Sequence, residues 1–506
     1  MTDDPGSGCP PARTSVGLTS LLLVPVALVA RGAAFVVPAL VALWFGVGEI
    51  TDAWFWALAF PTFALVLAST SLGTAITPVL ARVSRERRAD LPVVLGGLLA
   101  QAALGSTAFG LLICLAAPPL LDHLTDFTPE TASLALRFLW GLLPFMVLTT
   151  CAAVLRVACE VHAHFTAVAL TPILRASVVI LATWLALTPL GPMALPLGLV
   201  SGELAQLFFW GAVLYVRQGL LPRPSLRLDP AVLAVARDLA PILGGEVLVA
   251  LNLVIDKAFA ASLEPGSVAT LEYADRARVI PQTLLESTLL MVAFATWARL
   301  FAQGEVAAAR ASVRRSLSWV VALASPVLAG MFIGRQVLVQ LLFERGAFGH
   351  SDTLHTSTLL AWYLPGVLPN LLGILAVRAH IVERNLRLVL ALGVVSIVSN
   401  TLLNAALIGP LGLEGLALAT SLTMTLVPAA YLWALWRAWG AEGPPERRDR
   451  QFASGVAFAS ILIAAFVELS VGPPASLLDP VLWLAAVPCL GLAGLALFRQ
   501  RAAAAG

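Results

Sequence analysis

The chain has 506 residues, of which 59% are hydrophobic and 12% are charged, and its formal net charge at pH 7 is +2. A soluble domain carries about 25% charged residues, so this composition excludes a water-soluble globular protein and favours a lipid environment.

Apolar stretches long enough to cross a bilayer recur along the whole chain. A spanning helix needs about 20 mostly apolar residues, because backbone groups in hydrocarbon must form their hydrogen bonds within the helix. The pattern predicts an all-α, polytopic membrane protein with about 14 transmembrane helices. The expected spans are residues 18–47, 53–81, 91–117, 133–158, 166–188, 193–215, 240–263, 267–297, 316–342, 354–377, 388–408, 415–436, 452–469 and 481–498.

The basic residues are distributed unevenly between the connections. All of them are arginine except Lys257, and most lie in connections that follow even-numbered spans. The opposite connections hold mainly aspartate and glutamate, with Arg345 as the clearest exception. Because positively charged loops stay in the cytoplasm, we expect both termini to be cytoplasmic. The arginines are thereby explained by membrane orientation, and no nucleic-acid partner is expected.

Arg31 interrupts the apolar first span, with Gly32 beside it and prolines on both sides. An arginine at the bilayer centre costs at least about 2.5 to 3.5 kcal/mol, so it normally faces a cavity or a partner. We interpret Arg31 as a cation that faces a cavity, and a snorkelling or structural arginine is the alternative.

The seventh and eighth spans are the most polar and are the expected functional pair. Asp256 and Lys257 are neighbours and cannot face the same side of a helix, so each is expected to have another partner. Arg276 lies one turn after Glu272, and a local ion pair is the alternative to a ligand-binding role for it. In a later span, Asn400 and Asn404 share one helix face, where their amides can bond a neighbouring helix or offer oxygens to a cation.

Three landmarks recur at nearly one offset. Pro61 and Pro281, Arg156 and Arg378, and Pro189 and Pro410 are separated by 220, 222 and 221 residues. We therefore expect two six-helix pseudo-repeats followed by two C-terminal helices, and chance similarity of apolar segments is the alternative. The predicted domains are an N-terminal lobe at 1–228, a C-terminal lobe at 229–440 and a helix pair at 441–506. Repeated bundles of this kind are typical of alternating-access transporters.

Four stretches resemble the MurJ/MviN family of lipid flippases, within the multidrug, oligosaccharidyl-lipid and polysaccharide exporter superfamily. They are TDAWFWALAFP at 51–61, NLVIDKAFAASLEPGSVATLEYADRARVIP at 252–281, LLFERGAFGHSDT at 341–353 and PLGLEGLALATS at 410–421. The resemblance covers most of the first twelve expected spans. It implies a two-lobed transporter in the bacterial cytoplasmic membrane that moves a lipid-linked oligosaccharide, lipid II-like, to the outer leaflet.

The resemblance also implies a substrate site. The family's first-helix arginine falls on Arg31 and its eighth-helix arginine on Arg276, and Asp52, Asp275 and Arg278 complete the expected set. Guanidinium groups suit the diphosphate of such a cargo. The chain departs from the family at Val37, Leu65 and Thr70, where two arginines and a glutamate are expected.

A cation site of the family maps onto five residues. They are Asp256, Asn400, Asn404, Leu416 through its backbone, and Thr420, with an amide at Asn404 where the family can have a carboxylate. We therefore expect a monovalent cation, Na⁺ or H⁺, and no other cofactor.

Other function classes are distinguished as follows. A cation-coupled antiporter of drugs or small solutes needs chiefly a carboxylate and an apolar pocket, and Asp256 could supply the carboxylate. A membrane scaffold with decayed cavity chemistry is the second alternative, because part of the arginine cluster is replaced. The sequence carries no recognisable catalytic or ATP-binding motif, so we expect no enzyme. We expect a monomer whose partners are the lipid-linked substrate and membrane lipids.

Overall fold

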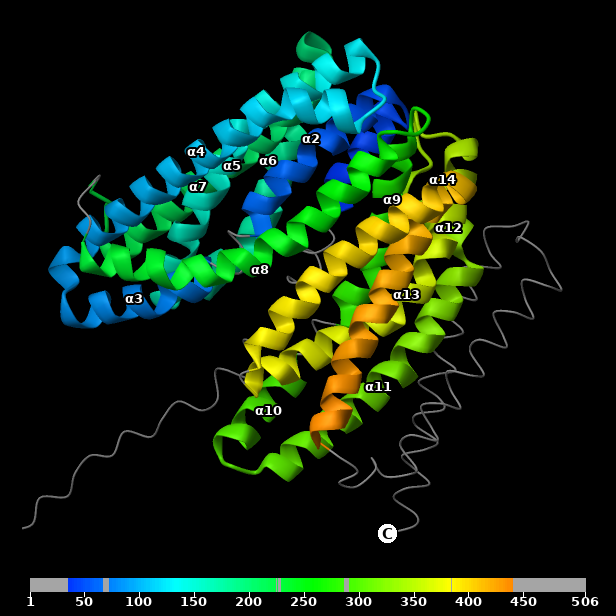
Figure 1. Cartoon of the computed structure of the whole chain (residues 1–506). Coiled ribbons are helices and arrows are strands. Elements are labelled where there is room, and N and C mark those ends of the chain that lie inside the picture. Colours follow the sequence, from blue (N-terminus) through cyan, green and yellow to red (C-terminus); the bar gives the residue numbers. More distant parts are fainter. Residues whose placement is uncertain are drawn as a thin grey trace, which may run out of the picture. The chain divides into compact units, whose positions relative to one another are not determined.

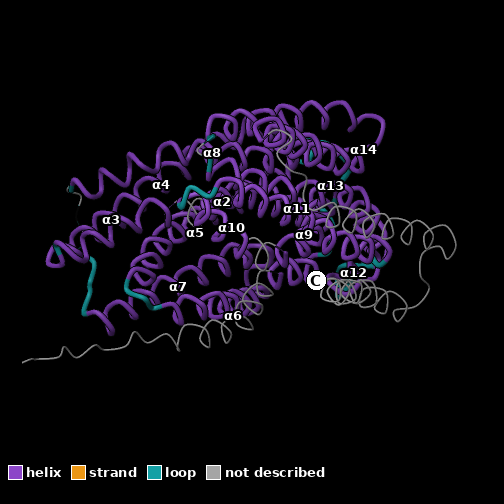
Figure 2. The backbone as a smooth tube through the Cα atoms, turned by 90° about the horizontal axis from the view of Figure 1, so that it is seen from below, coloured by secondary structure: helices purple, strands orange, loops and turns teal. Residues whose placement is uncertain are grey.

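The computed structural model describes residues 35–66, 72–223, 225, 229–285, 291–383 and 385–439, and the regular elements of these segments are all helical (Figures 1 and 2). A short helix at Phe35–Phe45 comes first. The other α-helices are α2 (Glu49–Val66), α3 (Leu72–Glu86), α4 (Leu91–Leu124), α5 (Pro129–Val161), α6 (Phe165–Leu190), α7 (Ala194–Gln218), α8 (Pro230–Ala260), α9 (Ser267–Leu285), α10 (Met291–Ala302), α11 (Val306–Ile333), α12 (Arg335–Phe343), α13 (His350–Val382) and α14 (Leu386–Trp439). Two short 3₁₀ helices, η2 (Arg88–Asp90) and η3 (Gly191–Met193), precede α4 and α7. The predicted all-α class is confirmed.

The helices are built for an apolar solvent. Within the described segments, six helical stretches are long and apolar enough to cross a membrane. Large apolar side chains on them are exposed at the surface, and Phe208, Val216 and Trp436 are 71%, 76% and 69% exposed. Water would penalise such a surface, whereas lipid accommodates it. These features agree with a polytopic membrane protein. The expected spans 452–469 and 481–498, and most of 18–47, lie outside the described residues.

The internal repeat is visible in the helix boundaries. α5 and α13 each contain 33 residues, and both their first and their last residues are 221 positions apart. α14 begins 221 residues after α6 begins and ends 221 residues after α7 ends. A coincidence of apolar segments would not reproduce both the length and the position of α5 in α13. The structure therefore supports the repeat that the proline and arginine spacings predicted.

Two pairs of glycines with left-handed backbone mark equivalent turns. Gly191 separates α6 from α7 with φ 56° and ψ −131°, and Gly412 bends α14 with φ 58° and ψ −131°. Gly46 and Gly266, before α2 and α9, have φ values of 62° and 96°. Side chains with a Cβ rarely adopt these conformations. Gly412 divides α14 between the expected spans 388–408 and 415–436, so the two expected spans are the two arms of one bent helix.

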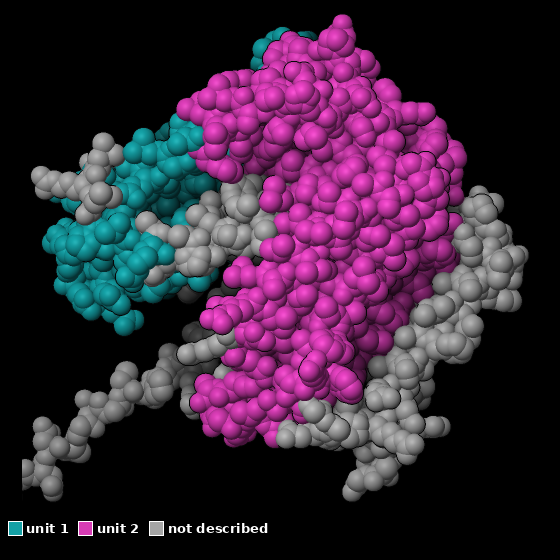
Figure 3. Space-filling model, in the orientation of Figure 1, with its two compact units in different colours: residues 1–38, 68–108, 141–239 teal, residues 39–67, 109–140, 240–506 magenta. Residues whose placement is uncertain are grey.

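The chain forms two compact units that interleave along the sequence (Figure 3). Unit 1 comprises residues 1–38, 68–108 and 141–239, and unit 2 comprises residues 39–67, 109–140 and 240–506. In unit 1 a buried cluster joins one face of α3 to α4, α5 and α7, with Ile76, Leu95, Val154 and Leu214 at most 1% exposed. The expected lobes 1–228 and 229–440 and the helix pair 441–506 remain a prediction.

Unit 2 holds α9 in place through buried aromatic rings. Tyr273 of α9 lies 5.2 Å from the Phe55 ring of α2, 5.0 Å from that of Phe343 and 5.3 Å from that of Phe348. Its hydroxyl donates a hydrogen bond to the carbonyl oxygen of Gly46 at 3.2 Å. The contacts with Phe55 and Phe348 are edge-to-face and that with Phe343 is tilted, so Tyr273 is packed against three rings, which restricts rotation of α9. The charged residues on α9 are therefore presented in fixed directions.

Candidate functional site

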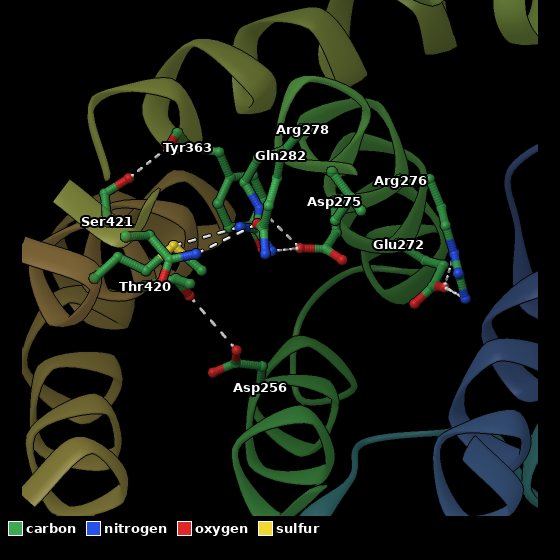
Figure 4. Close-up of polar contacts among 12 residues, drawn as sticks. Asp256, Glu272, Asp275, Arg276, Arg278, Gln282, Tyr363, Thr420 and Ser421 are labelled. Atoms are coloured by element: carbon green, nitrogen blue, oxygen red, sulfur yellow. Dashed lines mark hydrogen bonds and ion pairs between the residues drawn. The ribbon is translucent and has the colours of Figure 1, made fainter. Parts of the chain in front are cut away.

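α9 carries two arginines that point to different sides (Figure 4). Arg276 and Arg278 are two positions apart, which is a rotation of about 200° around a helix. Figure 4 shows Arg276 with Glu272 on one side of α9, and Arg278 with Asp275 on the side that faces Thr420. The structure therefore separates two arginines that the sequence assigned to one substrate site.

Arg276 belongs to a cluster of three charges, two of which are buried. Its Nη2 and Nε lie 2.6 and 2.7 Å from Glu272 Oε1. The other carboxylate oxygen of Glu272 lies 2.9 Å from Lys257 Nζ, and that amine also donates to the carbonyl oxygen of Phe55 at 2.8 Å. The side chains of Glu272 and Lys257 are each 4% exposed, whereas that of Arg276 is 38% exposed. The local pair that the sequence raised as an alternative is thus present, and Arg276 still reaches the surface of the chain.

Arg278 is held within unit 2. Its Nε donates to Asp275 Oδ1 at 2.9 Å, and Nη2 contacts the same oxygen. The guanidinium lies 5.3 Å from the centre of the Tyr363 ring, and Nη1 lies 3.4 Å from the sulfur of Met424. With 7% of the residue exposed, Arg278 is enclosed by α9, α13 and α14.

The five residues of the expected cation site come together in the structure. Asp256 Oδ1 accepts hydrogen bonds from the side-chain amides of Asn400 at 2.6 Å and Asn404 at 2.7 Å. The Thr420 hydroxyl lies 3.5 Å from Asp256 Oδ2 and donates to the carbonyl oxygen of Leu416 at 3.0 Å. Because α14 bends at Gly412, Thr420 on its second arm lies beside the two asparagines on its first arm. α8 thus meets both arms of α14 at Asp256.

The donor set at Asp256 fits a hard cation better than a transition metal. It offers carboxylate, amide, hydroxyl and backbone oxygens, which are the ligands of alkali and alkaline-earth ions. The Oδ1 atom of Asn404 is buried and has no hydrogen-bond partner, so one ligand oxygen is already unused. Among the described residues no group of three or more histidine, cysteine, aspartate or glutamate side chains could hold a metal ion. Asp256 is the one carboxylate among the five residues of the expected site, and a single negative charge suits a monovalent ion.

A cavity of about 600 Å³ lies inside unit 2 beside these groups. Asp256, Asn400 and Thr420 contribute to its wall, and so do Asp275 and Arg278. The remaining wall is largely apolar, with Leu253, Ile374, Val377, Met424 and Val427 among the lining residues. Arg276 does not line this cavity. Asp275 and Arg278 therefore share a compartment with the expected cation site instead of with Arg276.

Asp52 and Arg31 complete the set of expected substrate residues. Asp52 is 2% exposed, and its two carboxylate oxygens accept hydrogen bonds from the backbone N–H groups of Gly266 at 2.5 Å and Ala269 at 2.8 Å. It acts as a cap for the N-terminus of α9 from another helix. Arg31 lies outside the described residues. The substrate-binding roles of all five residues remain predictions.

Lys257 is a member of the Arg276 charge cluster that was not among the site residues expected from the sequence. It was expected to have a partner other than Asp256, and the structure confirms this, because Asp256 faces α14 and Lys257 faces α9 and α2. Its partner Glu272 is fifteen positions away, beyond the turn at 261–266, so helical spacing could not identify it. The available signal was the presence of the chain's single lysine in an apolar span.

Solved structures share this fold. A structure described as lipid II flippase MurJ in an inward closed conformation superposes with a TM-score of 0.78 and 19% identity, covering 95% of this chain and 99% of that one. An inward-facing multidrug resistance MATE family transporter of the MOP superfamily gives a TM-score of 0.62 and 13% identity, covering 84% of this chain and 99% of that one. At these identities the likeness concerns the fold.

Sequence relatives point to one family. A probable lipid II flippase MurJ of Vibrio cholerae is 26% identical over 300 residues, which are 59% of this chain and 56% of the relative. The corresponding protein of Haemophilus influenzae is 28% identical over 347 residues, or 66% of this chain and 65% of the relative. The chain thus matches between about half and two thirds of each of these relatives. The family model described as lipid II flippase MurJ matches residues 41–487, and the chain therefore belongs to the MurJ family.

Proposed function

We propose that this protein moves a lipid II-like substrate, a saccharide linked to polyprenyl diphosphate, from the inner to the outer leaflet by alternating access. Membership of the MurJ family over residues 41–487 is the observation that carries the proposal. The expected chemistry is also available, because Arg276 keeps an accessible guanidinium that can bind phosphate oxygens through two parallel hydrogen bonds.

The work required is binding and reorientation, without any covalent step. Arg276, together with Arg31, would hold the diphosphate while the polyprenyl chain stays in lipid. No bond of the substrate is made or broken, so we propose a transporter and no enzymatic activity. The two repeated bundles supply the elements that rock between inward-open and outward-open states.

The proposal is tested by a flipping assay in vesicles that contain the purified full-length chain. We expect Arg276→Ala to reduce the initial rate of headgroup translocation by at least about tenfold, because a charged phosphate contact in a shielded site is worth more than about 1.4 kcal/mol. Arg82→Ala, which changes an exposed arginine at the end of α3, is the control and should flip at the wild-type rate. Unchanged translocation in a variant lacking both Arg31 and Arg276 would contradict the proposal.

We propose that a monovalent cation at Asp256 drives the cycle. The four side chains and one backbone oxygen gathered there support the site, and the unused oxygen of Asn404 supports its occupation by an ion. Entry of one positive charge into the cell is worth about 2.3 kcal/mol per 100 mV of membrane potential, which is enough to bias reorientation.

The cation proposal is tested by replacing Na⁺ with choline at constant pH, and separately by changing pH at constant Na⁺. A sodium-coupled protein should lose flipping in choline, whereas a proton-coupled protein should respond to pH instead. In either case Asp256→Asn should abolish the dependence, because it removes the only carboxylate among the five site residues. An Asp256→Asn variant that keeps the wild-type ion dependence would contradict the site.

A second candidate is a cation-coupled antiporter of small solutes. The cavity of about 600 Å³ in unit 2 favours it, because that volume is within the range of about 300 to 1,000 Å³ typical of small-molecule sites. Overexpression in a drug-sensitive host distinguishes the two functions. Resistance to amphipathic cations that depends on Asp256 would favour the antiporter.

We also propose that the protein is a monomer of the bacterial cytoplasmic membrane with both termini in the cytoplasm. The arginine content of alternate connections supports this orientation. The partners in that setting would be the lipid-linked substrate and the surrounding membrane lipids.

A further inference from the structure

The cluster of Lys257, Glu272 and Arg276 contains two cations for one carboxylate. Each oxygen of Glu272 serves one partner, Oε1 the guanidinium of Arg276 and Oε2 the amine of Lys257. The two neighbouring carboxylates have other contacts, because Asp275 pairs with Arg278 and Asp256 accepts hydrogen bonds from the neutral amides of α14. The cluster therefore carries a net charge of +1, and Arg276 is its accessible member.

We propose that Lys257 is a positioning residue for substrate binding, because it neutralises Glu272 from the buried side and so leaves the positive charge of Arg276 available to an anionic headgroup. The inference rests on the proposed function, since it assumes that Arg276 meets a diphosphate. Beyond that function, we infer that Lys257 controls how strongly Arg276 binds the anionic headgroup, without contacting the headgroup itself.

The energetics favour this arrangement. A diphosphate that binds Arg276 competes with Glu272 for the same guanidinium. If Glu272 had no second partner, its displacement would leave a buried carboxylate unpaired, which is strongly unfavourable. With Lys257 at 2.9 Å, Glu272 keeps a charge partner after Arg276 turns to the substrate. The exchange then replaces one ion pair by another instead of breaking one.

The position of Lys257 is fixed independently of Arg276. Its amine donates to the backbone oxygen of Phe55 at 2.8 Å and lies 5.9 Å from the centre of the Phe55 ring. These contacts with α2 do not involve Arg276. With 3% of the residue exposed, Lys257 is not available to a large headgroup. An effect of Lys257 on headgroup affinity would therefore act through Glu272 and Arg276, and not through a direct contact with phosphate.

The test measures binding of undecaprenyl diphosphate to the full-length protein in nanodiscs. Lys257→Met removes the second cation and leaves Arg276 fully paired with Glu272, so affinity should fall by at least about tenfold. Glu272→Gln releases Arg276 and should bind at least as tightly as wild type. The double variant Lys257→Met with Glu272→Gln restores the net charge of +1 and should return to within about threefold of wild type. Lys257→Arg keeps the charge and should also bind.

Thermal unfolding of each variant separates folding from binding. If Lys257→Met does not fold, the double variant decides, because it contains neither the unpaired carboxylate nor the lysine. A double variant that folds but binds no better than Arg276→Ala would overturn the inference, since Lys257 would then be needed in its own right. Wild-type affinity in a folded Lys257→Met would overturn it too.

Arg276→Ala separates failure of the inference from failure of the proposed function. Loss of binding in Arg276→Ala with wild-type binding in Lys257→Met would contradict only the role of Lys257. Wild-type binding in Arg276→Ala would contradict the proposed substrate site itself.

Discussion

At the scale of single residues, side chains with similar sequence signatures have different surroundings. Arg276 and Arg278 lie in one short motif, yet the first is accessible and the second is enclosed beside Tyr363. Helical rotation predicts that they diverge, but it does not say which side is buried. That depends on α13 and α14, which come from much later in the chain.

Asp52 gives a prediction at this scale. Because both its oxygens accept backbone N–H groups at the start of α9, Asp52→Ala should lower the free energy of unfolding by about 1 to 2 kcal/mol. Thermal unfolding of the purified protein measures the change. Glu49→Ala, in the first turn of the same helix, is the matched control and removes an exposed side chain that accepts one hydrogen bond from Thr131. An equal loss of stability in both variants would contradict the capping role of Asp52.

The expected cation residues were predictable from sequence only through the family resemblance. Helical spacing places Asn400 and Asn404 on one face, and the structure confirms that both amides meet Asp256. Spacing does not place Thr420, because a bend at Gly412 separates it from the asparagines. The charge cluster at Lys257 was missed for a similar reason, since its partner follows a turn.

At the scale of elements, the repeat is the feature that sequence predicted best. Proline and arginine landmarks indicated the offset, and α5 and α13 reproduce it in both boundaries. The expected spans 133–158, 166–188 and 193–215 agree with α5, α6 and α7, whereas the expected span 316–342 crosses the break at Gly334 between α11 and α12. The division of the chain into interleaved units could not be predicted from landmark spacing or apolar windows, because it depends on which helices pack together.

The repeated glycine turns give a prediction at this scale. Gly412→Ala and Gly191→Ala place a Cβ on a left-handed backbone and should each destabilise the protein by about 1 to 2 kcal/mol. The space around both glycines is open, so the expected loss comes from backbone strain and not from a clash. Thermal unfolding again measures the effect.

Gly211→Ala is the control for both substitutions. Gly211 lies inside α7, has open space around it and lacks a positive φ value. Because alanine favours a helix over glycine, Gly211→Ala should be neutral or slightly stabilising. If Gly412→Ala and Gly211→Ala had the same effect, the positive φ value of Gly412 would not be the cause.

At the scale of the whole molecule, the exposed apolar surface and the arginine pattern together predict a membrane orientation. The prediction of orientation can be made from sequence, because hydropathy and loop charge depend little on which helices pack together. The substrate does not follow from these features, since the same bundle is shared by a MATE family transporter.

Cysteine accessibility tests the orientation in intact cells. After replacement of the five native cysteines, a membrane-impermeant maleimide should label Glu264→Cys and His123→Cys from outside. Arg88→Cys and Gln303→Cys should react only after the membrane is permeabilised. All four positions are exposed, so burial does not explain a difference between them. Labelling of Gln303→Cys from outside would reverse the predicted topology.

Asp256 and Lys257 occupy successive positions on α8, one facing the amides of α14 and the other facing Glu272 of α9. Because the two side chains project from adjacent positions of one helix, a rotation of α8 that changes the contacts of Asp256 would also move Lys257, which shares Glu272 with Arg276. If a cation at Asp256 is coupled to headgroup binding in this way, thermodynamic reciprocity requires each ligand to change the affinity of the other by the same factor. The coupling can be measured by titrating the headgroup at different cation concentrations, or the cation at different headgroup concentrations.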